Sequence, residues 1–153
     1  MSTPIPQSVH DALAPLAGVW VGTETMAPSE WAPKGGTADA RVDNRLDLDG
    51  FVVVQNYEQR RGEEVTHRGH AVVWWDAKSK KYAMTWWDSM GKPPNVFRGD
   101  WENGALVLMH HSKDGISRAT MRFDDDRYRF TMELSPKGKK WSTWMTGNYR
   151  REG

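Results

Sequence analysis

The stretch ADARVDNRLDLD, residues 38–49, alternates strictly between two kinds of side chain. Ala, Val, Leu and one Asn occupy one set of positions, and Asp and Arg occupy the other. Because successive side chains of a β-strand point to opposite faces, this pattern predicts a strand with one buried face and one solvated face. Residues 127–134 repeat the pattern, with an apolar face made of Tyr128, Phe130, Met132 and Leu134.

Turn signals such as Asp49-Gly50 and Asn103-Gly104 recur along the chain at intervals of about 8–12 residues, which is typical of an all-β sandwich or barrel. A short helix is expected at 9–14, with Ser8 as its N-cap. The chain, 1–153, is therefore expected to form one all-β domain, an antiparallel up-and-down barrel, with a two-sheet sandwich as the alternative. The ten strands are predicted near 18–26, 38–48, 51–60, 65–75, 81–88, 95–101, 105–111, 117–123, 127–134 and 141–150.

The composition bounds the class of protein. The chain has 153 residues and no cysteine, so a core without disulfides or thiolate chemistry is expected. Its 21 basic and 20 acidic residues give a net charge of +1, so neither nucleic acid nor a membrane is an expected partner. No run approaches the roughly 18 apolar residues of a membrane span, and the N-terminus lacks a signal-peptide pattern, which favours a cytoplasmic protein. The nine tryptophans should carry much of the buried area.

Several motifs resemble known barrel families. LAGVWVGTETM, residues 16–26, has a Gly-x-Trp start after a short helix, and is similar to lipocalin and fatty-acid-binding, or calycin-like, barrels. A longer series resembles, in order and spacing, the bacterial family of uncharacterised proteins DUF1579, from about Leu16 to Arg151. The motifs of this series are RGHAVVWWD (68–76), WWDSMGKPP (86–94), GDWENGALVL (99–108), RATMRF (118–123) and WSTWMTGNYRR (141–151). The resemblance implies a calycin-like barrel with a small-molecule cavity, and it implies no reaction.

Strand phase predicts which polar side chains face the barrel interior. Asn44 shares the apolar face of its strand, and a two-residue hairpin at Asp49-Gly50 would place Leu48 opposite Phe51 on that face. The inward face of the next strand would then consist of Phe51, Val53, Gln55 and Tyr57. Two interpretations of the patch of Asn44, Gln55 and Tyr57 stay open: a hydrogen-bond network satisfied within the protein, or one that a ligand or an ordered water completes.

His67 and His70 are spaced as a His-x-x-His metal pair, but on a strand they would point to opposite faces. The same argument separates His110 from His111, so no metal site is expected. His110 is in phase with the inward leucines of its strand. Arg118 is most simply solvent-facing, although it could reach the barrel mouth and hold an anionic group.

The segment 69–91 predicts a hairpin with a candidate acid–base pair. We expect His70 and Trp74 to face inward on its first strand, and Trp86 and Asp88 on its second. An aspartate beside a histidine in an apolar cavity raises the histidine pKa and holds one tautomer, which suits a general acid–base. Alternatively, Asp88 bonds local backbone in a turn. If the strand parity is reversed, Trp75 and Trp87 form the core and this chemistry is lost.

These residues support a hypothesis and two alternatives. The first is that the barrel binds a small apolar or aromatic molecule, for which the candidate residues are Trp20, Asn44, Phe51, Gln55, Trp74, Trp86, His110 and Arg118. The second is a cofactor-independent lyase or isomerase acting on an aromatic substrate. In it His70 is the acid–base, Asp88 orients it, and Tyr57 with Asn44 stabilises developing charge. The third is haem binding through His70 or His110, on the analogy of the nitrobindins, a related barrel family that binds haem through a histidine. No cofactor motif is present, a homodimer is left open, and loop 27–37 is a candidate lid.

Overall fold

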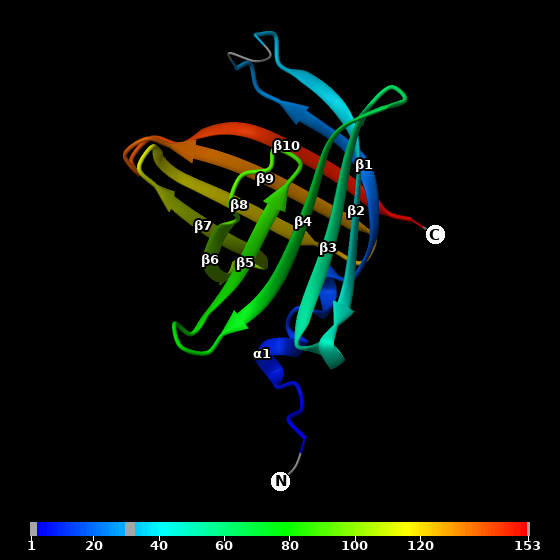
Figure 1. Cartoon of the computed structure of the whole chain (residues 1–153), viewed down its shortest axis with the longest axis vertical. Coiled ribbons are helices and arrows are strands. Elements are labelled where there is room, and N and C mark those ends of the chain that lie inside the picture. The colour runs from blue at the N-terminus through cyan, green and yellow to red at the C-terminus, as the bar shows by residue number, and fades with distance from the viewer. Residues whose placement is uncertain (1–2, 30–32, 153) are drawn as a thin grey trace.

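The computed structural model describes residues 3–29 and 33–152. Within them, antiparallel strands form a closed barrel in which each strand pairs with its neighbours in sequence and β1 pairs with β10 (Figure 1). The expected barrel is confirmed, and the sandwich is not what forms. The strands are β1 (Gly18–Met26), β2 (Gly36–Asp47), β3 (Val52–Arg61), β4 (Glu64–Asp76), β5 (Lys81–Asp88), β6 (Asn95–Glu102), β7 (Ala105–Ser112), β8 (Gly115–Phe123), β9 (Arg127–Ser135) and β10 (Ser142–Arg151).

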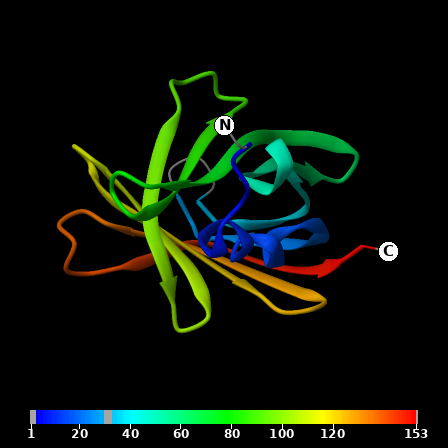
Figure 2. The same cartoon turned by 90° about the horizontal axis from the view of Figure 1, so that it is seen from below.

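One end of the barrel is covered by the N-terminal segment, and we call it the closed end. Helix α1 (Ser8–Asp11) and a 3-10 turn, η1 (Ala14–Leu16), lie across it (Figure 2). The helix is shorter than expected, and its N-cap is Gln7 rather than Ser8. The backbone N–H of Gln7 donates to Nδ1 of His10 at 2.9 Å, so the histidine satisfies a group that the helix leaves free.

The N-terminal segment is held in the closed end by buried leucines and by hydrogen bonds to the barrel. Leu13 and Leu16 are fully buried. The Tyr82 hydroxyl donates to the carbonyl oxygen of Val9 at 2.7 Å, and the Trp20 indole N–H donates to that of Leu16 at 3.0 Å. The opposite end, where β1 joins β2 and β3 joins β4, we call the open end. No helix among the described residues is long and apolar enough to cross a membrane.

The strand register shows which residues face inward, because directly opposite residues share a face. Trp20 pairs with Val42, and Val42 pairs with Tyr57 on β3. Tyr57 pairs with Gly69, and Gly69 pairs with Asp88. Trp20 and Val42 are buried in the core, so this whole row of residues faces the interior.

The turn between β2 and β3 differs from the expected two-residue hairpin. A 3-10 turn, η2 (Leu48–Gly50), intervenes, and the N–H of Phe51 donates to the carbonyl oxygen of Leu48. Leu48 is therefore 66% exposed instead of facing the core. The face assignment for β3 still holds, because Asn44 pairs directly with Gln55.

The candidate lid, loop 27–37, is only partly described. Strand β2 already begins at Gly36, and residues 30–32 lie outside the described residues. A lid role for this loop stays a prediction.

Candidate functional site

The inner face of the barrel is sealed at the closed end and reached by solvent at the open end. Trp20 and Leu108 point inward and are fully buried. Toward the open end, the inward-facing Tyr57 is half-buried. The side chains of His67 and Asp88 are 28% and 24% exposed. The open end is therefore where a small molecule could contact the inner face.

A buried glutamate, Glu24, lies at the centre of the hydrogen bonds on this inner face. It is in phase with Trp20 on β1 and is 0% exposed. The Tyr57 hydroxyl and the Gln59 side-chain amide donate to its Oε1 at 2.5 and 2.9 Å. The Tyr149 hydroxyl donates to its Oε2 at 2.5 Å. Three donors satisfy the buried group, so its burial is tolerated.

A glycine on β10, Gly147, leaves the space that the Tyr149 hydroxyl needs to reach Glu24. Gly147 pairs directly with Glu24, and the Tyr149 hydroxyl lies 2.2 Å from where a Cβ atom of residue 147 would be. A larger residue at 147 would therefore displace the hydroxyl from the carboxylate. The motif WSTWMTGNYRR thus contains both the donor and the space that the donor occupies.

The tyrosines around Glu24 are held in their neutral form. Burial raises the pKa of Tyr57, Tyr128 and Tyr149 well above the ordinary value of 10.0. The nearby Glu24 carboxylate raises the pKa of each further. Tyr57 and Tyr149 therefore remain hydrogen-bond donors to Glu24 at any physiological pH.

A histidine and an aspartate lie side by side on the inner face, but the histidine is not His70. His70 is exposed on the outer face, where its Nδ1 lies 2.9 Å from Oδ1 of Asn56, so the expectation that it faces inward is wrong. His67 is the inward histidine, and its Nε2 lies 3.7 Å from Oδ2 of Asp88. The indole N–H of Trp86, which also faces inward, donates to the same Oδ2 atom of Asp88 at 3.1 Å.

The two interpretations of Asp88 are combined in one side chain. Its Oδ2 is bound by Trp86 inside the barrel, as the inward interpretation requires. Its Oδ1 accepts from the backbone N–H of Met90 at 3.0 Å, as the turn interpretation requires. Asp88 is therefore held rigidly at the rim beside His67.

The register of β4 with β5 decides which tryptophans face inward. Ala71 pairs with Trp86, and Trp75 pairs with Tyr82. Trp75 and Trp86 consequently pack against the core, whereas Trp87 is 40% exposed. Trp74 was expected inside, but it lies on the outer face, where its indole N–H donates to Oγ1 of Thr85 across the strand pair.

The remaining candidates divide between the two faces. His110 faces inward, with Nδ1 3.0 Å from the carbonyl oxygen of Val96 and its ring against Phe97. Arg118 is bonded to both carboxylate oxygens of Glu133 at 3.0 and 3.1 Å. It lies over the Trp141 ring on the outer face, away from any internal ligand.

Of the two histidines offered as haem ligands, His70 lies outside the barrel and only His110 faces its interior. For a metal, His67 and Asp88 supply two donors. No group of three His, Asp or Glu side chains with suitable geometry occurs among residues 3–29 and 33–152.

The other expected wall residues lie deeper or elsewhere. Trp20 belongs to the sealed core, and Phe51 packs edge-on against His10 at the closed end. The Asn44 side-chain amide donates to the Leu16 carbonyl oxygen at 3.0 Å, while its Oδ1 is buried without a partner. Gln55 is 8% exposed and faces inward beside Asn44. The polar patch is therefore only partly satisfied within the described protein.

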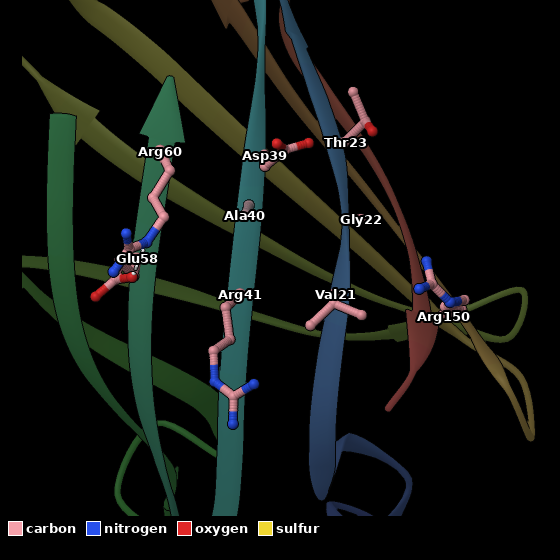
Figure 3. A pocket seen from close by; sticks show the side chains of 9 residues that line it. All are labelled: Val21, Gly22, Thr23, Asp39, Ala40, Arg41, Glu58, Arg60 and Arg150. Atoms are coloured by element: carbon pink, nitrogen blue, oxygen red, sulfur yellow. Dashed lines mark hydrogen bonds and ion pairs between the residues drawn. The ribbon is translucent and has the colours of Figure 1, made fainter. Parts of the chain in front are cut away.

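A hollow lies on the outside of the barrel, over β1, β2, β3 and β10 (Figure 3). Its volume is about 370 Å³. Its charged side chains are largely paired among themselves or with neighbours, Arg41 with Glu152 and Arg60 with Glu58. This lining does not suit the apolar or aromatic molecule that the sequence suggests, so we place the candidate site inside.

Sequence reasoning missed Glu24, Gln59, His67 and Tyr149 as site residues. Glu24 carried a usable signal, because it shares the phase of the buried Trp20 on one strand. His67 and His70 are separated only by strand parity, which the sequence left open.

The fold and the inner face define a closed, up-and-down antiparallel barrel of the calycin-like class. The chain belongs to the family described as "Protein of unknown function (DUF1579)", whose family model matches residues 5–151. The expected family membership is therefore confirmed over almost the whole chain.

Among solved structures, the chain is similar to the one titled "Crystal Structure of Rv2717c from M. tuberculosis". The TM-score is 0.72, at 12% sequence identity, and the match covers 96% of this chain and 99% of that chain. At this identity the similarity supports the fold alone. A search among curated proteins found no match.

Proposed function

We propose that the protein binds a small molecule with an aromatic or apolar body inside the barrel, entering at the open end. The observation that carries this proposal is that inward-facing side chains at that end are exposed to solvent. His67 and Asp88 point into the barrel yet remain 28% and 24% exposed, whereas Trp20 at the closed end is fully buried. Small-molecule sites are typically concave and lined with aromatic side chains and a few polar groups.

The side chains near the open end fit this kind of ligand. The rings of Tyr57 and Trp86 lie 5.8 Å apart and are inclined at 57°. Tyr57 also lies 6.0 Å from the His67 ring. A flat apolar molecule would contact these rings, and Asp88 and His67 would supply polar contacts at the rim.

The test is native mass spectrometry of protein purified from its own host, followed by identification of any co-purifying molecule. Trp86→Ala and Trp87→Ala are a matched pair, since the two residues are adjacent and face opposite sides. We expect Trp86→Ala to lose the bound molecule and Trp87→Ala to retain it. Equal retention by both variants would contradict binding inside the barrel.

A second candidate is proton transfer on a bound aromatic substrate, favoured by the His67–Asp88 pair on the inner face. His67 would act as the general acid–base and Asp88 would orient it. The role of Tyr57 changes, because its single hydroxyl hydrogen is donated to Glu24 and is not free for developing charge. The Asn44 amide donates one N–H to the Leu16 carbonyl oxygen at the closed end.

The two candidates are separated by comparing His67→Ala with His70→Ala. If the protein is an enzyme, His67→Ala keeps its affinity for the co-purified molecule and stops its turnover, while His70→Ala retains both. If wild-type protein binds the molecule and converts it to no product, the enzyme candidate is excluded and binding remains.

A further inference from the structure

We propose that the barrel prefers an aromatic ligand that carries a cationic nitrogen, and that it rejects the anionic counterpart. This inference rests on the proposed function and names the ligand class for the same site. It comes from the charges, aromatic faces and unpartnered polar groups of the inner face.

The inner face is negatively charged. Glu24 and Asp88 both point inward, on β1 and β5. Among the strand residues that the structure describes, arginine and lysine side chains in the inward phase occur only at the two ends, and the inward histidines are His67, beside Asp88, and His110. Arg151 lies over Trp20 at the closed end, and Arg61 is exposed at the rim beside Gly36.

Glu24 has no cationic partner among the described side chains. Its three contacts, Tyr57, Gln59 and Tyr149, all donate hydrogen bonds and none carries a positive charge. A carboxylate accepts only, so this set of donors fits the ionised form. Away from bulk water its field is weakly screened, so an anion entering the barrel would be repelled and a cation attracted.

Two aromatic faces lie beside these charges. Tyr57 is hydrogen-bonded to Glu24 and has its ring 5.8 Å from that of Trp86, whose indole N–H is bonded to Asp88. A cation over the face of Trp or Tyr is attracted by the ring quadrupole. An ammonium group near these rings would therefore meet both kinds of attraction.

A second observation is an inward-facing amide that has no partner within the protein. Gln55 lies two positions before Tyr57 on β3, faces inward and is 8% exposed. Its side chain makes no hydrogen bond to any residue within 3–29 and 33–152. The carbonyl oxygen of this amide is suited to accept from an ammonium N–H.

The test uses isothermal titration calorimetry of the full chain with three probes that share one aromatic body. They are 1-naphthylmethylamine as the cation, 1-naphthalenemethanol as the neutral probe and 1-naphthaleneacetate as the anion. We expect the cation to bind about tenfold tighter than the alcohol and the anion to bind weakest. Asp88→Asn should reduce the cation affinity about three- to fivefold and leave the alcohol unchanged.

Asp43→Asn is the matched control, because this substitution removes the same charge from the outer face of β2. Glu24→Gln should reduce the preference for the cation further. If the Glu24→Gln variant does not fold, because Glu24 is buried, the Asp88→Asn variant still tests the inference. Equal binding of the three probes, or equal effects of Asp88→Asn and Asp43→Asn, would overturn this inference alone. If none of the probes binds wild-type protein, the proposed aromatic ligand falls as well.

Discussion

The indole of Trp86 occupies the space that a Cβ atom would take at Gly69. The Cη2 atom of Trp86 lies 2.0 Å from that position, and Cζ2 and Cζ3 lie at 2.5 and 2.7 Å. Gly69 separates Tyr57 on β3 from Asp88 on β5 in the same inward row. The absence of a side chain at 69 therefore leaves room for the indole between Tyr57 and Asp88.

Gly69→Ala should lower the free energy of unfolding by about 1–3 kcal/mol, because the added methyl group overpacks the site and moves the indole. Urea denaturation followed by circular dichroism measures this change. Gly36→Ala is the control, since its Cβ would meet only the exposed Arg61 guanidinium at 3.4 Å. That variant should stay within about 0.5 kcal/mol of wild type.

The clash involves the outer ring atoms of Trp86, which phenylalanine lacks. In the Trp86→Phe background, Gly69→Ala should therefore cost less than about 0.5 kcal/mol, which a double-mutant cycle measures as coupling between the two sites. A cost that is the same in both backgrounds would show that Gly69 matters for its backbone and not for the indole.

Tyr149→Phe should lower the free energy of unfolding by about 1–3 kcal/mol, because it leaves Oε2 of the buried Glu24 without its hydroxyl donor. Tyr128→Phe removes a hydroxyl that makes no hydrogen bond to a described residue, although the ring is equally buried. The Tyr128 variant should be close to wild type. Chemical denaturation of both variants gives the comparison, and equal losses would contradict the role assigned to Glu24.

Each of the four tyrosines has a pKa raised above its ordinary value of 10.0, chiefly by burial. In the unfolded chain the same groups lose their protons near pH 10, whereas the folded chain retains them to higher pH. Their contribution to stability is thus fully present below pH 10 and is lost as the pH rises above it.

The expected result is that tyrosinate absorbance at 295 nm appears only as the protein unfolds in alkali. Circular dichroism recorded on the same samples should change over the same pH range. A tyrosinate signal that develops near pH 10 while the barrel signal persists would contradict the buried, neutral tyrosines.

The alternation of residues 38–49 was sufficient to predict which face of that strand is buried, because it leaves one wet face and one dry face. The segment 69–91 was not decided in this way, since Trp and charged residues occur in both phases. There the pairing with β3 places His67 inside, opposite Gln59, and His70 outside, opposite Asn56. Parity alone could not distinguish these histidines.

Glu24 was missed for a different reason. A glutamate in an otherwise alternating strand is most often solvated, and its three donors come from two strands, β3 and β10, that are distant in sequence. Only the closure of the barrel, which pairs β1 with β10, brings Tyr149 to it. Long-range contacts of this kind follow from topology and not from local pattern.

The hydrogen bond from the Tyr82 hydroxyl to the Val9 carbonyl oxygen ties the N-terminal segment to the barrel at the closed end. Tyr82→Phe should weaken that attachment by about 1 kcal/mol. Hydrogen exchange would then become about fivefold faster at the amides of Leu13 and Leu16, which are bonded only within the segment. Exchange in the strands should not change. Faster exchange throughout the barrel would mean instead that Tyr82 supports the core as a whole. Unchanged exchange at Leu13 and Leu16 would mean that these buried leucines alone hold the segment in place.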